Sequence, residues 1–77
     1  MTRVCFIVNP IAGRGQGLAC WKQIAPLAAR LGEYGVKFTE GPGDGTELAR
    51  LAVKEGYDRV VSLGGDGTLN EVGNGLV

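Results

Sequence analysis

Apolar residues gather in three short runs along the chain, at residues 3–8, 36–39 and 58–63. In the first run, Val-Cys-Phe-Ile-Val follows Arg3 without alternating polar and apolar positions. Such an unbroken run is typical of a strand that is buried on both faces of a parallel sheet. We therefore expect the three runs to form three β-strands with these boundaries.

The stretch after the first run has the spacing of an amphipathic helix. We expect this helix at residues 18–31, after a loop at residues 9–17 that is rich in glycine. Pro26 lies inside the helix and should bend it, and Gly32 is placed to end it. The apolar face should consist of Leu18, Trp21, Ala25, Ala28 and Leu31.

Two further helices are expected, one after each of the other strands. Asp44 with Glu47 three residues later is the pattern of a helix N-cap, and Gly56 would close that helix. Thr68 and Glu71 repeat the capping pattern at the start of the third helix. The apolar positions are Leu48, Leu51 and Ala52 in the second helix, and Leu69, Val72 and Leu76 in the third.

The alternation of strands and helices implies parallel strands that are joined by right-handed crossovers. The expected fold class is therefore α/β, with an open parallel sheet in a three-layer arrangement. A chain of 77 residues allows one domain at most. The last helix has no stop signal before Val77, and a three-stranded sheet leaves exposed edges. We therefore expect this chain to be cut from a longer one.

Charge and composition exclude several classes of function. Eight basic residues balance eight acidic ones, whereas binding to a nucleic-acid backbone needs a basic surplus, so nucleic acid is not an expected partner. The absence of histidine excludes histidine-based metal sites within the chain. No apolar stretch approaches the roughly 20 residues of a membrane span, so any membrane contact would be peripheral. Cys5 and Cys20 are expected to be reduced thiols, packed as small core residues of a cytoplasmic protein.

A glycine-rich turn, Gly-Gly-Asp-Gly-Thr at residues 64–68, joins the third strand to the third helix. Its glycines permit positive φ and a close approach of ligand to backbone, and a helix N-terminus favours an anion. Asp66 would repel a phosphate, so its natural partner is a metal ion, a ribose hydroxyl or a water. Phosphate, metal and hydroxyl together indicate a nucleotide and phosphoryl transfer. A tight turn that only caps a helix is the plainer alternative.

Three segments resemble the diacylglycerol kinase catalytic-domain family, which includes bacterial lipid kinases and the sphingosine and ceramide kinases. Residues 64–72, Gly-Gly-Asp-Gly-Thr-Leu-Asn-Glu-Val, are similar to the nucleotide loop of that family, with Gly75-Leu76 after it. Residues 8–13, Val-Asn-Pro-Ile-Ala-Gly, resemble its first loop, and Thr39-Glu40 resembles its third nucleotide contact. NAD kinases and phosphofructokinases carry similar Gly-Gly-Asp-Gly-Thr loops, but the extension through residue 72 and the first loop favour the lipid kinases.

The resemblance implies a Rossmann-like, nucleotide-binding N-terminal domain at residues 1–77, of the kind found in NAD kinases and phosphofructokinases. It would be part of a transferase of phospholipid biosynthesis that moves the γ-phosphoryl group of ATP, with Mg²⁺, to a diacylglycerol-type hydroxyl. The partners would be ATP and a lipid at a membrane surface. Whether the protein forms a homo-oligomer is left open. Asp66 would be the catalytic and metal-binding residue. The nucleotide contacts would come from Asn9, Thr39, Gly64, Gly65, Asp66, Gly67 and Thr68.

In such a protein the lipid-binding domain and the general base would lie beyond residue 77, so this piece alone would be inactive. The loops after the first and third strands must serve one nucleotide, which predicts the strand order 2-1-3. Thr39 could instead be only a β-forming residue at a strand end, and Asn9-Pro10 only a strand-ending turn. An NAD-kinase-like enzyme and a non-catalytic nucleotide-binding module are the alternative functions.

Overall fold

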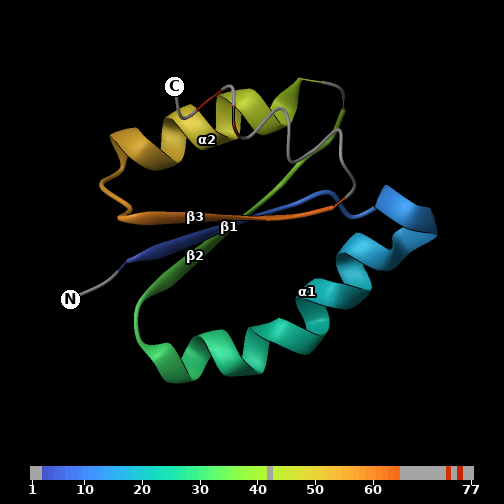
Figure 1. The fold of residues 1–77 in the computed structure, drawn as a ribbon, viewed down its shortest axis with the longest axis horizontal. Coiled ribbons are helices and arrows are strands. Elements are labelled where there is room, and N and C mark those ends of the chain that lie inside the picture. Colours follow the sequence, from blue (N-terminus) through green and yellow to red (C-terminus); the bar gives the residue numbers. More distant parts are fainter. Residues whose placement is uncertain (1–2, 42, 65–72, 74, 76–77) are drawn as a thin grey trace.

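The computed structural model describes residues 3–41, 43–64, 73 and 75. In chain order its elements are β1 (Val4–Val8), α1 (Ala12–Leu31), β2 (Tyr34–Phe38), α2 (Asp44–Lys54) and β3 (Arg59–Leu63). The three strands are parallel and lie in the order β2-β1-β3 (Figure 1). The expected α/β class and the 2-1-3 order are therefore confirmed. The expected third helix falls outside the described residues, apart from Gly73 and Gly75.

The central strand β1 separates two apolar layers, because successive side chains of a strand point to opposite faces. Cys5 and Ile7 are fully buried against α2, in a cluster with Ala49 and Ala52. On the other face, Phe6, Val8, Trp21 and Ala28 form a second cluster against α1. Figure 1 shows the resulting three layers, with α2 on one side of the sheet and α1 on the other. The unbroken apolar run of β1 thus reflects burial on both faces.

Three aromatic rings hold α1 to the sheet. The ring of Phe6 lies 5.1 Å from that of Trp21 and 6.1 Å from that of Tyr34. Trp21 and Tyr34 are 5.8 Å apart, between ring centroids. Tilted and edge-on pairs at these distances contribute about 0.5–1.5 kcal/mol each beyond the burial of their surface. Tyr34 belongs to β2, which begins two residues earlier than the sequence pattern suggests, so this ring is part of the core.

The start of α1 differs from the prediction. Helical structure begins at Ala12 instead of residue 18, but the backbone is left-handed at Gly13, Arg14 and Gly15, with φ values of 58°, 60° and 94°. Regular right-handed helix therefore begins only after this turn. The left-handed conformation causes no steric clash at Gly13 and Gly15, because glycine has no Cβ. Arg14, in contrast, is held in a conformation that non-glycine residues rarely adopt. Gly32 follows the helix as expected.

The start and the buried face of α2 also correct the prediction. The N-cap is Gly43, with a left-handed φ of 87°, and no side chain caps the helix there. Asp44 instead accepts hydrogen bonds from the backbone N–H groups of Glu40 (2.7 Å) and Gly41 (3.0 Å), so its carboxylate orders the preceding loop. Of the expected apolar face, Ala52 is buried and Leu48 packs against the buried cluster, but Leu51 is exposed. The buried positions of α2 are Gly45, Ala49 and Ala52.

Polar contacts tie the elements together at the amino end of the sheet. Arg3 receives hydrogen bonds at its carbonyl from the N–H groups of Asp58 (2.8 Å) and Arg59 (3.2 Å), and its own N–H donates to the Asp58 carboxylate (2.9 Å). Its guanidinium donates to the Glu55 carbonyl (3.0 Å) and lies 4.7 Å from the centre of the Tyr57 ring. This end of the sheet is therefore closed by interactions within the chain itself.

A lysine and a thiol near α2 have shifted pKa values. Lys37 on β2 lies 2.6 Å from the Glu55 carboxylate, and this hydrogen bond raises the pKa of the lysine. Burial raises the pKa of the Cys5 thiol, because the low-polarity interior disfavours the thiolate. At neutral pH Lys37 is therefore charged and Cys5 is a neutral thiol.

Candidate functional site

Three of the residues expected to contact a nucleotide lie side by side at the carboxyl end of the sheet. Val8 pairs with Phe38 on one side and with Leu63 on the other. One residue further along each strand come Asn9, Thr39 and Gly64. The N–H of Asn9 donates to the Leu63 carbonyl (2.9 Å), and that of Thr39 donates to the Val8 carbonyl (2.9 Å). The strand order thus brings together residues that are 55 positions apart in the sequence.

Asn9 shapes the loop between β1 and α1. Its side-chain oxygen accepts a hydrogen bond from the N–H of Ile11 (3.2 Å), and its carbonyl accepts one from the N–H of Ala12 (3.3 Å). A side-chain amide that binds the backbone two residues later makes an Asx turn. The strand-ending turn anticipated at Asn9-Pro10 is therefore real, and it turns the chain directly from β1 into α1.

Thr39 is a buried polar residue, with 8% of its surface exposed. It follows β2 directly, so it is not the last residue of the strand as the sequence pattern suggests. Among the described residues, no hydrogen bond engages its hydroxyl group. Thr39 therefore brings a polar side chain to the carboxyl edge of the sheet.

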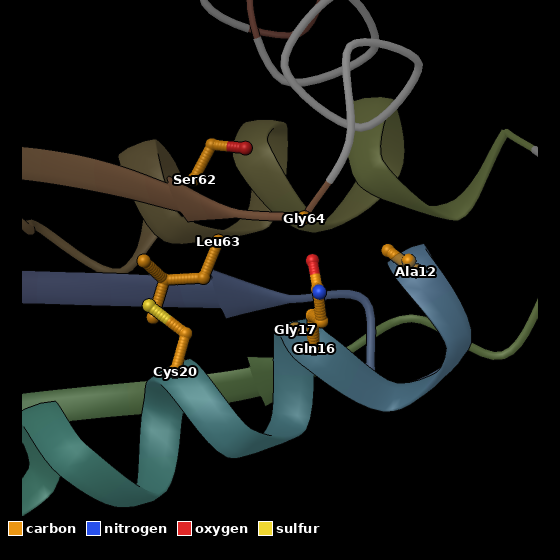
Figure 2. A pocket seen from close by; sticks show the side chains of 8 residues that line it. Ala12, Gln16, Gly17, Cys20, Ser62, Leu63 and Gly64 are labelled. Atoms are coloured by element: carbon orange, nitrogen blue, oxygen red, sulfur yellow. The ribbon is translucent and has the colours of Figure 1, made fainter.

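A cavity of about 310 Å³ opens beside these residues, between the first turns of α1 and the end of β3. Figure 2 shows the amide of Gln16 directed toward Gly64, and the thiol of Cys20 beside Leu63. The volume is at the lower end of the range for small-molecule sites. Within the described part of the chain, none of the lining side chains is charged, so the cavity suits a neutral or hydrogen-bonding part of a ligand. Its lining consists of Ala12, Gly13, Gln16, Gly17, Cys20, Ser62, Leu63 and Gly64.

Sequence reasoning missed most of this lining. The expectation that both cysteines are core residues is confirmed for Cys5, which is buried, and is wrong for Cys20, which is exposed on the cavity wall. Cys20 lies off the apolar face of α1, where Trp21 and Ala28 are buried and Leu18 and Ala25 pack beside them. The helical spacing itself therefore places Cys20 outside the core, and the general tendency of free cysteines to be buried was the wrong guide. The sequence offers no signal for Gly17, because it falls in the glycine-rich loop expected at residues 9–17, and only the structure places it inside α1.

The other predicted site residues, Gly65, Asp66, Gly67 and Thr68, lie outside the described residues. Within the described part of the chain, no group of three or more acidic, cysteine or histidine residues could hold a metal ion. None of the described helices is long and apolar enough to cross a membrane.

This chain is similar to known proteins of one family. The family model described as diacylglycerol kinase catalytic domain matches residues 3–77. A diacylglycerol kinase of Staphylococcus haemolyticus is 39% identical over 72 residues, which cover 92% of this chain and 22% of that protein. A ceramide kinase of Oryza sativa subsp. japonica is 38% identical over 74 residues, covering 91% of this chain and 12% of that protein.

A solved structure shows the same fold. The crystal structure of a diacylglycerol kinase from Bacillus anthracis superposes with a TM-score of 0.80 at 35% identity, over 96% of this chain and 27% of that one. The chain spans about a quarter of the length of the bacterial relatives that it matches. The similarity therefore covers the whole of this chain but only a minor part of each relative.

Proposed function

This chain belongs to the diacylglycerol kinase catalytic-domain family, and we propose that it forms the nucleotide-binding part of an ATP-dependent lipid kinase. The proposal rests on one observation: Asn9, Thr39 and Gly64 lie side by side at the carboxyl ends of three adjacent strands. The chain leaves β1 toward one face of the sheet and β2 toward the other. Open parallel sheets bind ligands in the crevice at such a switch point.

Each of these residues would bind a different part of the nucleotide. The backbone N–H groups of Gly64, Gly65 and Gly67 would bind phosphate oxygens, and Thr68 would donate its hydroxyl. Asn9 and Thr39 would hydrogen-bond the nucleotide from the neighbouring strands. Asp66 would hold Mg²⁺, which supplies positive charge against the transferring phosphoryl group.

The acceptor would be the hydroxyl group of a diacylglycerol-type lipid. In the proposed reaction the hydroxyl oxygen forms a bond to the γ-phosphorus, the bond from that phosphorus to the β–γ bridging oxygen breaks, and ADP leaves. The hydroxyl proton goes to a general base that we place in a part of the protein outside residues 1–77, together with the lipid-binding domain. By itself the 77-residue chain would bind the nucleotide without transfer. The intact protein would be cytoplasmic and would meet its lipid at the membrane surface.

The test is transfer of ³²P from γ-labelled ATP to diacylglycerol in mixed micelles, with the full-length protein that carries this sequence. Asp66→Asn keeps the shape of the side chain and removes its charge. Turnover should fall by at least about 10²-fold, the scale of losing one well-placed electrostatic contact. The thermal melt should be nearly unchanged. Equal turnover of both proteins across a Mg²⁺ titration would contradict the role of Asp66.

The same assay separates the alternatives. An NAD-kinase-like enzyme would label NAD and leave the lipid unlabelled. A non-catalytic module would bind ATP in an equilibrium titration and label neither acceptor.

A further inference from the structure

We propose that Gly17 is a positioning residue for the nucleotide site, holding the Asn9 loop and the wall of the cavity in their relative places. Gly17 touches none of the reacting atoms in this proposal. It acts through Asn9 and through the first regular turn of α1. The kinetic part of the test rests on the proposed function, whereas the thiol-alkylation part does not.

The contact behind the proposal is between two backbones. Gly17 is buried, and a Cβ placed on it would overlap the carbonyl oxygen of Asn9 and lie 3.1 Å from the Asn9 carbonyl carbon. It would also lie 3.7 Å from the Cβ of Ala12. A side chain can turn away from an added methyl group, but a carbonyl oxygen can move only with its chain. Any side chain at position 17 must therefore displace α1 or the Asn9 loop.

Gly17 is needed for space and not for its backbone conformation. Gly13 and Gly15, earlier in the same loop, have positive φ values of 58° and 94°, which explains glycine there. Gly17 lies in the right-handed part of α1 and has no positive φ. In a helix interior, alanine would be more favourable than glycine by about 1 kcal/mol. The glycine therefore serves the close approach of the helix to Asn9.

The consequence of that approach is local to the candidate site. Asn9 is a proposed nucleotide contact, and Gly17 itself lines the cavity that ends at Gly64. Moving α1 away from Asn9 would widen the cavity and shift the Asn9 side chain at the same time. A misplacement of about 1 Å at a reacting centre can cost about 10²-fold in rate. We expect the loss to appear in the handling of ATP, because no lipid-binding group is assigned to these residues.

Two other glycines provide matched controls. A Cβ on Gly35 would overlap the Tyr57 hydroxyl group, but Gly35 pairs with Cys5 and Cys5 with Val60 in the amino-terminal half of the sheet. Gly41 has an ordinary φ, and a Cβ added to it would have no atom within 4 Å. The three glycine-to-alanine changes are chemically identical. They differ in where they collide and with what: Gly17 meets a backbone carbonyl at the site, Gly35 meets a side chain away from it, and Gly41 meets open space.

The experiment compares Gly17→Ala, Gly35→Ala and Gly41→Ala in the full-length protein. Steady-state kinetics give kcat and the KM values for ATP and diacylglycerol, and thermal melts give stability. Gly17→Ala should raise the KM for ATP by about 10-fold or more and leave the KM for the lipid within about 2-fold. Gly35→Ala should lower the melting temperature without changing the KM for ATP, and Gly41→Ala should change neither. An unchanged KM for ATP in Gly17→Ala, an equal rise in Gly35→Ala, or an unfolded Gly17→Ala protein would overturn the positioning role.

A second readout needs no nucleotide. Cys20 lines the same cavity, so its rate of alkylation by iodoacetamide, followed by mass spectrometry, reports whether the cavity has opened. Gly17→Ala should speed the alkylation of Cys20 relative to the wild type and to Gly41→Ala, and an unchanged rate would overturn the proposal. If the wild type transfers phosphate to no lipid, the proposed function fails, and the alkylation rates alone decide the role of Gly17.

Discussion

Replacing Thr39 by valine separates a residue that serves the nucleotide from one that serves only the fold. Valine has nearly the shape of threonine but no hydroxyl group. Thr39 is 8% exposed, and its hydroxyl has no hydrogen-bond partner among the described residues. The change therefore leaves no other described group unpaired. The free energy of unfolding should change by less than about 1 kcal/mol, because no net hydrogen bond is lost on folding.

The effect on ATP should be much larger. A hydrogen bond from a hydroxyl to a charged group contributes about 1.5–3 kcal/mol, and each 1.4 kcal/mol is about a factor of ten in affinity. If Thr39 donates to a phosphate oxygen, Thr39→Val should weaken ATP binding by about 10- to 150-fold. Thr39→Ser provides the reverse change, since it keeps the hydroxyl and removes one buried methyl group. That variant should keep ATP affinity and lose about 1 kcal/mol of stability.

Calorimetric titration with ATP and denaturant unfolding of both variants give the two quantities. The reasoning would be refuted if Thr39→Val lost more than about 2 kcal/mol of stability while its affinity for ATP stayed that of the wild type. Thr39 would then be a structural residue of the sheet edge.

The polar contacts give two further predictions. Asp44→Ala removes the acceptor of two backbone hydrogen bonds, from Glu40 and Gly41, and should lower the free energy of unfolding in denaturant by about 1 kcal/mol. Asp44→Asn keeps an acceptor and should recover part of that loss. Equal stability of the wild type and both variants would contradict the role of this carboxylate. The pKa values of Cys5 and Lys37 are raised above their ordinary values of 9.0 and 10.5, so their contribution to stability is complete below pH 9 and is lost as the pH rises through the raised values. Melting temperatures should therefore fall from about pH 9 upward, less steeply in Cys5→Ala, and identical slopes would show that the thiol does not contribute.

The sheet could be predicted from the sequence because its signals are strong and independent. The apolar run of β1 has no polar position to expose, so it had to be central. The order β2-β1-β3 then followed from the requirement that the loops after β1 and β3 share one ligand. The match of Asn9, Thr39 and Gly64 at one edge is a consequence of that order.

The details of the helices could not be predicted, because each depended on tertiary contacts. Asp44 has the sequence of a capping residue, but the preceding loop brings two N–H groups to its carboxylate, and Gly43 takes the cap position instead. Leu51 fits an apolar face by spacing, yet α2 packs on the sheet through alanine and glycine, which allow a close approach. The prediction for Cys20 is wrong because it followed the usual burial of free cysteines, whereas Cys20 lies off the apolar face of α1 that carries Trp21 and Ala28.

The central claim is that ATP binds at the carboxyl ends of the strands and reaches the cavity between α1 and β3, where Cys20 is placed to report it. In the native protein, iodoacetamide should alkylate Cys20 and spare Cys5, which is fully buried and has a raised pKa. Trypsin separates the two thiols, because cleavage after Arg14 and Lys22 releases residues 15–22 with Cys20 alone. Saturating ATP with Mg²⁺ should slow the alkylation of Cys20 several-fold, and lipid micelles without ATP should not. An alkylation rate that stays the same at saturating ATP would contradict the placement of the nucleotide in this cavity.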